Sequence, residues 1–171
     1  RFIPLKGYDY LIEAISILKG RESNDLRVIF VGYGDHQKNY EKKVNDLGLN
    51  DIIHFSDWIS RCELNNLYQI ADMFIHGALI EPFGFVIAEA MANKTPIVSS
   101  KVGAAKDAIT HLESGYLVPP ANSNEIANGI NYILNNDTQK MVSNAFEKVN
   151  QMFTIEAMWN GHYQVYKKLM K

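Results

Sequence analysis

Two glutamates and a glycine lie where the chain turns from a loop into an apolar segment. Glu81 and Glu89 are eight residues apart, and Gly84 precedes the apolar run 85–92, in which Glu89 is the only charge. A carboxylate on a helix that is apolar nearly all round needs a partner, because burying it bare is costly. Gly84 would let a ligand approach the backbone just before a helix start, and that position favours an anion.

Three interpretations of the glutamate pair are open from the residues alone. Glu81 and Glu89 could be an acid and a base acting on a glycosidic bond. They could instead bind a ligand through its hydroxyls, or they could be solvated glutamates on a helix surface. Glu89 lies one turn after Phe85 and so shares the face of the helix start. A carboxylate there can accept from both hydroxyls of a ribose while the helix N-terminus holds phosphates, which suits a nucleotide.

Two cations and two glycines precede this segment in the chain. Arg1 and Lys6 could clamp a diphosphate, the first by its planar fork and the second as a point charge, or both could be solvated surface cations. Gly32 and Gly34 directly follow a predicted strand, either as a tight turn or as a loop that passes close to a phosphate or sugar. A dinucleotide fingerprint would need a third glycine where Gln37 stands, which argues against NAD.

Composition excludes several classes of protein. The chain has 171 residues and a net charge of −2, so we expect one domain over 1–171 and no nucleic-acid partner. Cys62 is the single cysteine, which excludes an internal disulfide and fits a reducing, cytoplasmic setting. No apolar run reaches the ~18 residues of a membrane span. The histidines show no metal-ligand spacing, and His76, at the end of a predicted strand, is interpreted as structural. We expect no cofactor and no metal.

Short β-branched runs alternate with longer runs of helical period. Strands are expected at 27–31, 52–55, 73–76, 96–99 and 116–118, with 2–3 as the stub of another strand. Helices are expected near 8–19, 37–47, from 60, 85–92, 104–111, 122–134, 138–150 and 155–170. This order predicts an α/β fold, a Rossmann-like three-layer sandwich with a parallel sheet of about six strands plus C-terminal helices. Ligands of such sheets bind beyond the carboxyl ends of the strands.

An ordered set of short motifs runs through the chain. They are Arg1-x4-Lys6-Gly7, Val31-Gly32-x-Gly34, Ala71-Asp72-Met73-Phe74-Ile75, Glu81-x-Phe83-Gly84, Glu89-Ala90-Met91-Ala92, Pro96-Ile97-Val98 and Gly115-Tyr116-Leu117-Val118-Pro119-Pro120. In this order they resemble the carboxy-terminal, donor-binding domain of the family-four retaining glycosyltransferases of the GT-B fold. The resemblance covers essentially the whole chain and implies that the chain binds a nucleotide-sugar donor, UDP- or GDP-linked.

The resemblance also implies a role for each matching residue. Arg1 and Lys6 match the pair that neutralises the donor diphosphate, and Glu81 matches the carboxylate near the donor sugar; these three would form the catalytic group. The donor-binding positions would be Gly32, Gly34, Trp58, Ile59, Gly84, Phe85, Val86 and Glu89. Within that set, the amides of 85 and 86 would hold a phosphate, Glu89 would bind the ribose hydroxyls, and residues 58 and 59 would contact the base.

Retaining glycosyl transfer to a saccharide or lipid-linked acceptor, without a metal, is therefore the expected activity. It fits polysaccharide biosynthesis on the cytosolic side of a membrane. The abrupt start at Arg1 suggests a cut within a longer protein whose amino-terminal acceptor domain is absent, so we expect the isolated domain to be inactive. A peripheral membrane contact of the longer protein is left open. The alternatives are a nucleotide-binding or scaffolding module without catalysis and a GT-B sugar-nucleotide epimerase.

Overall fold

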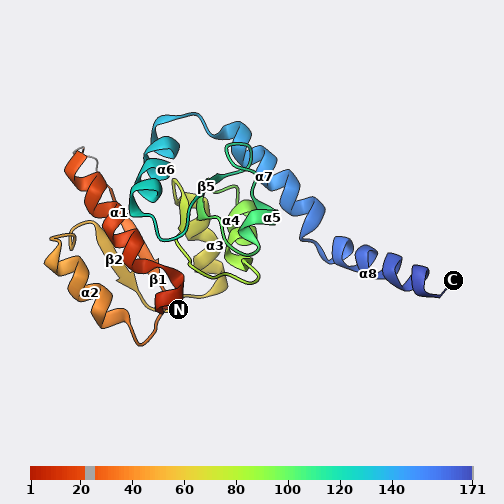
Figure 1. The fold of residues 1–171 in the computed structure, drawn as a ribbon, viewed down its shortest axis with the longest axis horizontal. Helices are drawn as coiled ribbons and strands as arrows, with labels where there is room; N and C mark the ends of the chain where they lie inside the picture. The colour runs from red at the N-terminus through yellow and green to blue at the C-terminus, as the bar shows by residue number, and fades with distance from the viewer. Residues whose placement is uncertain (22–25, 171) are drawn as a thin grey trace.

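The computed structural model describes residues 1–21 and 26–170 (Figure 1). Its strands are β1 (Val28–Val31), β2 (Ile53–Ser56), β3 (Phe74–His76), β4 (Ile97–Ser100) and β5 (Tyr116–Val118). Its helices are η1 (Pro4–Lys6), α1 (Tyr8–Arg21), α2 (Gln37–Asp46), α3 (Arg61–Ile70), α4 (Phe85–Ala92), α5 (Ala105–Ala108), α6 (Ser123–Asn135), α7 (Gln139–Met152) and α8 (Ile155–Leu169). The predicted alternation of strands and helices, and with it the α/β class, is confirmed.

The strands form two parallel sheets instead of one. β1 pairs with β2, and β3, β4 and β5 pair in that order, with every ladder parallel. The described part of the chain has five strands, one fewer than the expected number of about six. Residues 2–3 do not form the expected strand. Phe2 is fully buried in a loop, where its N–H donates to the Tyr33 carbonyl, so burial and not strand pairing explains its apolar side chain.

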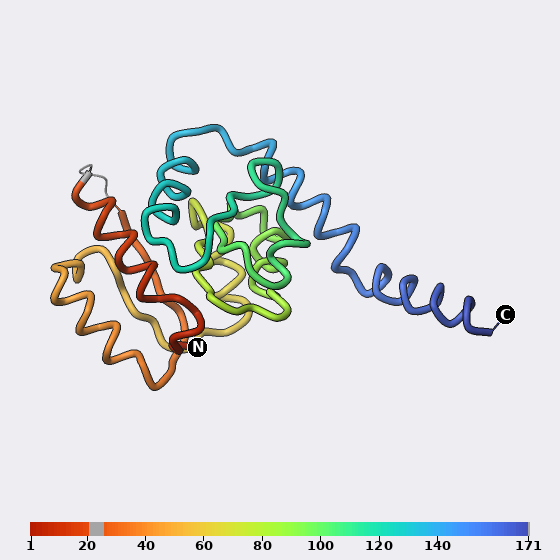
Figure 2. Tube along the Cα trace, in the orientation of Figure 1, coloured from red at the N-terminus to blue at the C-terminus, as the bar shows by residue number. Residues whose placement is uncertain are grey.

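Helices join the two sheets and cover them. α1 packs against α6, and these two helices run side by side where the two halves of the body meet (Figure 1, Figure 2). One buried cluster lies around β1, α1 and α6 and includes Phe30, Ile12 and Ile130. A second cluster lies around α4 and includes Ile87 and Met91. The loops that follow β3 and β4 meet next to the start of α4, where Glu81 accepts from the N–H groups of Ala104 and Gly84.

Local signals explain where several helices begin. Ser60 and Glu63 form a complete capping box at the start of α3, as the sequence predicts. At the start of α6 the side chain of Asn122 accepts from the N–H of Glu125. α2 is tied to α1 because Lys43 Nζ lies 2.9 Å from Asp9 and 2.7 Å from Glu13. Lys43 therefore has two carboxylate partners on α1.

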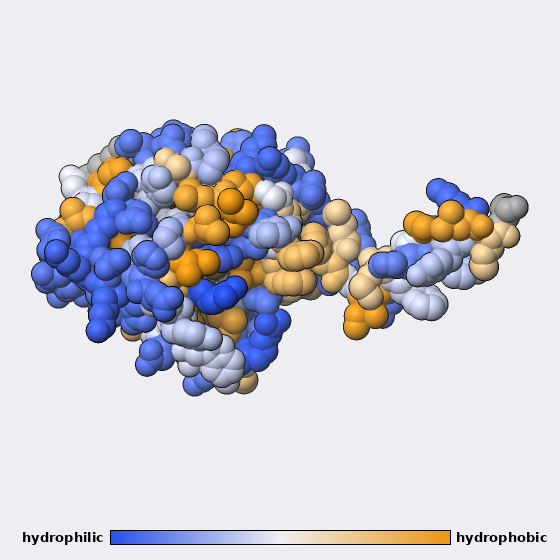
Figure 3. All heavy atoms as spheres, turned by 60° about the horizontal axis from the view of Figure 1, so that its bottom comes forward, coloured by the Kyte–Doolittle hydropathy of each residue, from blue (hydrophilic) through white to orange (hydrophobic). Residues whose placement is uncertain are grey.

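The last two helices differ in how they meet the body. α7 lies against α4 and buries Met141, Ala145 and Val149. α8 follows it but stands clear of the body, and none of its described residues is buried (Figure 3). Apolar and aromatic side chains such as Ile155 and Trp159 are exposed on it. Among the described residues, no helix has the length and the apolar character that crossing a membrane requires.

Candidate functional site

An ion pair joins the first helical turn to the loop after β3. Lys6 Nζ lies 2.6 Å from Glu81 Oε2. The side chain of Lys6 is 32% exposed and that of Glu81 is 10% exposed. Lys6 ends η1, and the carbonyl of Leu5 in the same turn accepts from the N–H of Leu79. The pair thus connects residues 75 positions apart in the chain. It brings together two of the three residues that the sequence assigned to the catalytic group.

Two glycines make this approach of the two segments possible. Gly7 follows η1 in the left-handed region, with φ of 68°. A Cβ added at Gly7 would lie 1.9 Å from the carbonyl oxygen of Gly77, which no side chain tolerates. A Cβ at Gly77 would meet the side chain of Leu11 at 2.7 Å. The loop after β3 therefore rests directly on the backbone that carries Lys6.

Glu81 is held from several sides. Its Oε1 accepts from the N–H of Gly84 at 3.2 Å, and its carbonyl accepts from the N–H of Ala104. Gly103 passes so close that a Cβ there would collide with the Glu81 carbonyl. Burial alone would raise the pKa of Glu81, but the hydrogen bonds and charge of Lys6, with those from Gly84 and His76, lower it to about 2. At neutral pH this group is an acceptor and cannot serve as a proton donor.

His76 adds a contact that sequence reasoning did not assign to the site. It ends β3, is 7% exposed, and its Nε2 lies 3.3 Å from Glu81 Oε2. Its Nδ1 lies 3.1 Å from the hydroxyl of Ser99 on β4. Burial lowers the pKa of His76, although the neighbouring Glu81 acts in the opposite direction. The available signal was its place at the carboxyl end of a strand, on the ligand side of a parallel sheet.

The start of α4 lies directly beside this cluster. Gly84 is its N-cap, with φ of 65°, and is buried. Phe85 and Val86 are the first helical residues, and the N–H groups at such positions have no partner within the helix. The ring of Phe85 is 72% exposed and stacks on Phe83. The position predicted to hold an anion therefore lies at a helix N-terminus, and Glu81 connects it to Lys6.

Glu89 lies one turn further along α4 and already has partners on α3. Its Oε1 accepts from Arg61 Nη1 at 2.6 Å, and its Oε2 accepts from the hydroxyl of Tyr68 at 3.4 Å. The Glu89 side chain is 18% exposed, whereas that of Arg61 is 68% exposed. Burial, and next the charge of Glu89, raises the pKa of Tyr68. The partner that the sequence required for Glu89 is thus supplied within the chain, by an arginine that solvent can reach.

The glycines after β1 contact the start of the chain. A Cβ at Gly34 would lie 2.5 Å from the carbonyl of Phe2, so this position is small because another backbone crosses it. Gly32, with φ of 138°, lies against the backbone nitrogen of Arg1. Arg1 is exposed and is joined to Lys6 through Ile3, whose N–H donates to Arg1 and whose carbonyl accepts from Lys6. The close approach of the Phe2 backbone therefore explains why residue 34 is a glycine, without any need for a ligand.

Trp58 and Ile59 lie in the loop that leads into α3. Trp58 is 73% exposed, and Ile59 is half-buried. This loop is followed at once by Arg61, the partner of Glu89. Trp58 and Ile59, the predicted contacts of the base, are therefore close in the chain to Arg61, which pairs with Glu89.

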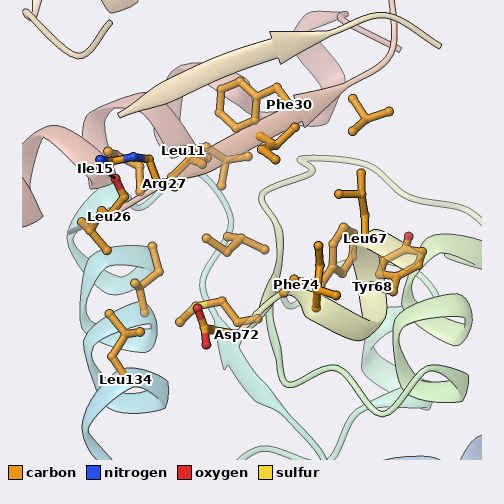
Figure 4. Close-up of a pocket in the computed structure, with 18 of the residues that line it drawn as sticks. Leu11, Ile15, Leu26, Arg27, Phe30, Leu67, Tyr68, Asp72, Phe74 and Leu134 are labelled. Atoms are coloured by element: carbon orange, nitrogen blue, oxygen red, sulfur yellow. Dashed lines mark hydrogen bonds between the residues drawn. The ribbon is translucent and has the colours of Figure 1, made fainter. Parts of the chain in front are cut away.

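A separate apolar cavity of about 660 Å³ lies between β1 and β3. Leu11, Phe30, Leu67, Phe74 and Leu134 are among the residues that line it (Figure 4). None of the residues that line it belongs to the predicted site. Within the ranges 1–21 and 26–170, no group of histidine, cysteine and carboxylate side chains is arranged to hold a metal ion.

Comparison with known proteins relates the whole chain to one family. A family model described as glycosyl transferases group 1 matches residues 1–149. An uncharacterized glycosyltransferase of Methanocaldococcus jannaschii is 32% identical over 168 residues, which are 97% of this chain and 43% of that protein. The chain therefore spans less than half the length of such relatives.

Solved structures agree with this relation. HepE of Anabaena, solved in complex with UDP and glucose and with UDP-glucose, is similar with a TM-score of 0.85 and 30% identity in the first of these. The match covers 99% of this chain and 46% of HepE. The C-terminal domain of a group 1 glycosyl transferase from Francisella tularensis matches with a TM-score of 0.80 and 28% identity, over 91% of this chain and 83% of that domain.

Proposed function

Since the chain belongs to the group 1 glycosyl transferases, we propose that it supplies the donor site of an enzyme that uses a UDP- or GDP-sugar. The observation that carries this proposal is the Lys6–Glu81 pair beside the N-terminus of α4. It combines a cation, an ionised carboxylate and free helix amides in one place. The proposal also rests on the similarity to a protein solved with UDP-glucose.

The diphosphate would bind where positive groups converge. Lys6 is partly exposed and has three N–H donors, of which the contact with Glu81 uses one. Arg1 lies on the surface a few residues earlier and would add a planar fork for phosphate oxygens. The amides of Phe85 and Val86 would donate to phosphate oxygens at the positive end of the α4 dipole. These groups would neutralise the diphosphate without a metal.

The nucleoside would lie along α4 toward α3. Glu89 would accept from the ribose hydroxyls, and for this its carboxylate must be shared with Arg61 or released by it. Because Arg61 is largely exposed, moving it costs little, since exposed ion pairs contribute only about 0–1 kcal/mol. Trp58 and Ile59 would contact the base beside Arg61. This arrangement extends the nucleotide from α4 to the loop before α3.

The chemistry follows from charge that develops as the sugar leaves. The bond between the anomeric carbon and the diphosphate breaks, and negative charge grows on the leaving diphosphate. Preorganised cations and amides stabilise that charge more in the transition state than in the ground state. Glu81, whose pKa is about 2, would accept hydrogen bonds from sugar hydroxyls and would not act as a general acid. The reaction would retain the anomeric configuration, as in the family that the motifs resemble.

The acceptor would bind outside this chain. The chain spans 43% of the Methanocaldococcus relative and 46% of HepE. We therefore propose that a saccharide or lipid-linked acceptor is held by the remainder of a longer protein, and that this chain alone binds the donor without transferring its sugar.

Melting of the 171-residue chain with added nucleotides tests the proposal. At a hundredfold excess over Kd, a ligand stabilises the folded state by about 2.7 kcal/mol. This corresponds to a rise in Tm of about 5–10 °C for a chain of this size. UDP or GDP should give the shift, and uridine or guanosine, which lack the diphosphate, should give much less. If neither nucleotide nor their sugars move the Tm, the donor site is disproved.

A further inference from the structure

A buried row of polar groups stands behind the Lys6–Glu81 pair. His76 on β3 and Ser99 on β4 are neighbours in the parallel ladder. Ser99 is fully buried and His76 nearly so. The row runs from Lys6, which solvent reaches, through Glu81 and the imidazole to Ser99. Only the first two of these residues have an assigned role in the proposed donor site.

Counting hydrogens fixes the form of the imidazole. Glu81 is ionised and can only accept, so the ring nitrogen that faces it, Nε2, must carry a proton. Burial favours a neutral ring, which leaves Nδ1 as an acceptor. Nδ1 then accepts from the hydroxyl of Ser99 at 3.1 Å. The Ser99 hydroxyl also lies 3.1 Å from the Ser100 carbonyl. It has a single hydrogen, so it cannot donate to this carbonyl while it donates to Nδ1.

The two donors on Glu81 Oε2 differ in what they can do when a ligand arrives. Lys6 is at the surface and can turn toward a phosphate, whereas His76 is enclosed and cannot leave. Without a second donor, the loss of Lys6 would leave a buried carboxylate held only by the N–H of Gly84. Such a group would be strongly disfavoured.

We propose that His76 is a positioning residue that holds the Glu81 carboxylate through its Nε2–H, with Ser99 fixing the tautomer, so that Glu81 stays in place when Lys6 engages a ligand phosphate. The last clause rests on the proposed function. His76 acts through Glu81 and makes no contact with the donor. Ser99 in turn acts through His76.

Two measurements on the 171-residue chain test this. The first is the ¹⁵N NMR signature of the imidazole at pH 7 without ligand. We expect His76 to be neutral with the proton on Nε2, and S99A to weaken that preference. A proton on Nδ1 alone, or a doubly protonated ring, would overturn the proposal. This NMR measurement needs no nucleotide.

The second measurement is the ratio of the affinities for UDP-glucose and UDP, or for GDP-mannose and GDP if the chain prefers GDP. In the proposed donor site Glu81 binds the sugar, so H76L should weaken sugar-nucleotide binding about tenfold relative to the free nucleotide. H76Q retains an N–H that can reach Glu81 and should restore most of the ratio. H54Q, at an exposed histidine of β2, is the matched control and should change nothing. A merely structural histidine would alter both affinities alike.

The outcomes separate the two proposals. If H76L does not fold, two other results decide whether His76 positions Glu81. They are the affinity ratio of sugar nucleotide to free nucleotide in H76Q and S99A, and the tautomer of the His76 ring in the wild type. If H76L folds and the ratio is unchanged, His76 does not position Glu81. If the wild-type chain binds no nucleotide but its ring carries the proton on Nε2, the pairing with Glu81 stands and the donor site is rejected.

Discussion

Glu81 is the residue on which most of the site's contacts converge. Lys6, His76 and Gly84 each donate to its carboxylate, and Gly103 passes against its backbone. From the sequence alone, this glutamate could have been an acid or base, a carboxylate that binds a ligand, or a solvated surface group. The contacts decide in favour of an ionised acceptor, because each of them stabilises the charged form.

The low pKa of Glu81 predicts how stability depends on pH. Its pKa falls from 4.5 to about 2 on folding, so the contribution of Glu81 is complete above about pH 4.5 and is lost as the pH falls toward 2. The full contribution is at most about 3 kcal/mol. Urea unfolding of the wild type between pH 5 and pH 2.5 should therefore lose stability more steeply than that of E81Q. Parallel pH profiles of the two proteins would contradict the assignment.

Glu89 should matter more for binding than for folding. E89Q removes an ion pair with an exposed arginine, so its free energy of unfolding should change by less than about 1 kcal/mol. The affinity for UDP or GDP should fall about tenfold or more, because two hydrogen bonds to a charged acceptor are weakened. Titration calorimetry measures this.

R61A is the matched control for E89Q. It breaks the same ion pair but keeps the carboxylate, so nucleotide affinity should be retained. Equal losses of affinity in R61A and E89Q would mean that the pairing itself, and not a carboxylate for ribose, is what matters at this position.

At the scale of elements, the contact between η1 and the loop after β3 positions Lys6. Gly7 is the residue that permits it, since its Cβ would overlap the carbonyl of Gly77. G7A should destabilise the chain by about 2 kcal/mol or more through its left-handed φ and this collision. G20A, within α1 and with no atom within 4 Å of its added Cβ, should leave stability unchanged or slightly raise it. Chemical unfolding of both variants checks the difference, and equal stabilities would show that the loop can move away.

The sequence predicted the elements much better than their contacts. The apolar run after Gly84 predicted α4 at 85–92, and a short apolar run between turn residues predicted β5 at 116–118, where the structure has them, because these signals are local. The motifs also pointed to Lys6 and Glu81, but not to the bond between them, since that bond spans 75 positions. His76 was interpreted as structural for the same reason, because its partners come from a loop and from β4. Pairing between segments far apart leaves no period in the chain.

At the scale of the molecule, the resemblance inferred from the ordered motifs is confirmed by the family match over residues 1–149. The separation of the sheet into two was not predictable, because each strand keeps its apolar character in either arrangement. The two halves are held together where α1 packs on α6. The candidate site draws on both halves, since Lys6 precedes α1 and Glu81 follows β3.

The two C-terminal helices should contribute very differently to stability. Ending the chain after Thr154 removes α8, which buries no described residue, and should change the free energy of unfolding by less than about 1 kcal/mol. Ending it after Asp137 also removes Met141 and Val149, which are buried, and should cost roughly 3 kcal/mol or more. Thermal unfolding of the two truncated chains measures the contrast. A large loss in the first would show that α8 packs on the body.

In the described part of the chain, no strand pairs with the edge of β1 or of β3 that borders the cavity between them. Val28 and Gly32 donate toward β2, so the alternation of a strand turns the N–H of Ile29 and Val31 the other way. Phe74 likewise donates toward β4, which turns Ile75 toward the cavity. In heavy water, the amide hydrogens of Ile29 and Ile75 should therefore be replaced by deuterium sooner than those of Val28 and Phe74, their neighbours in the same strands.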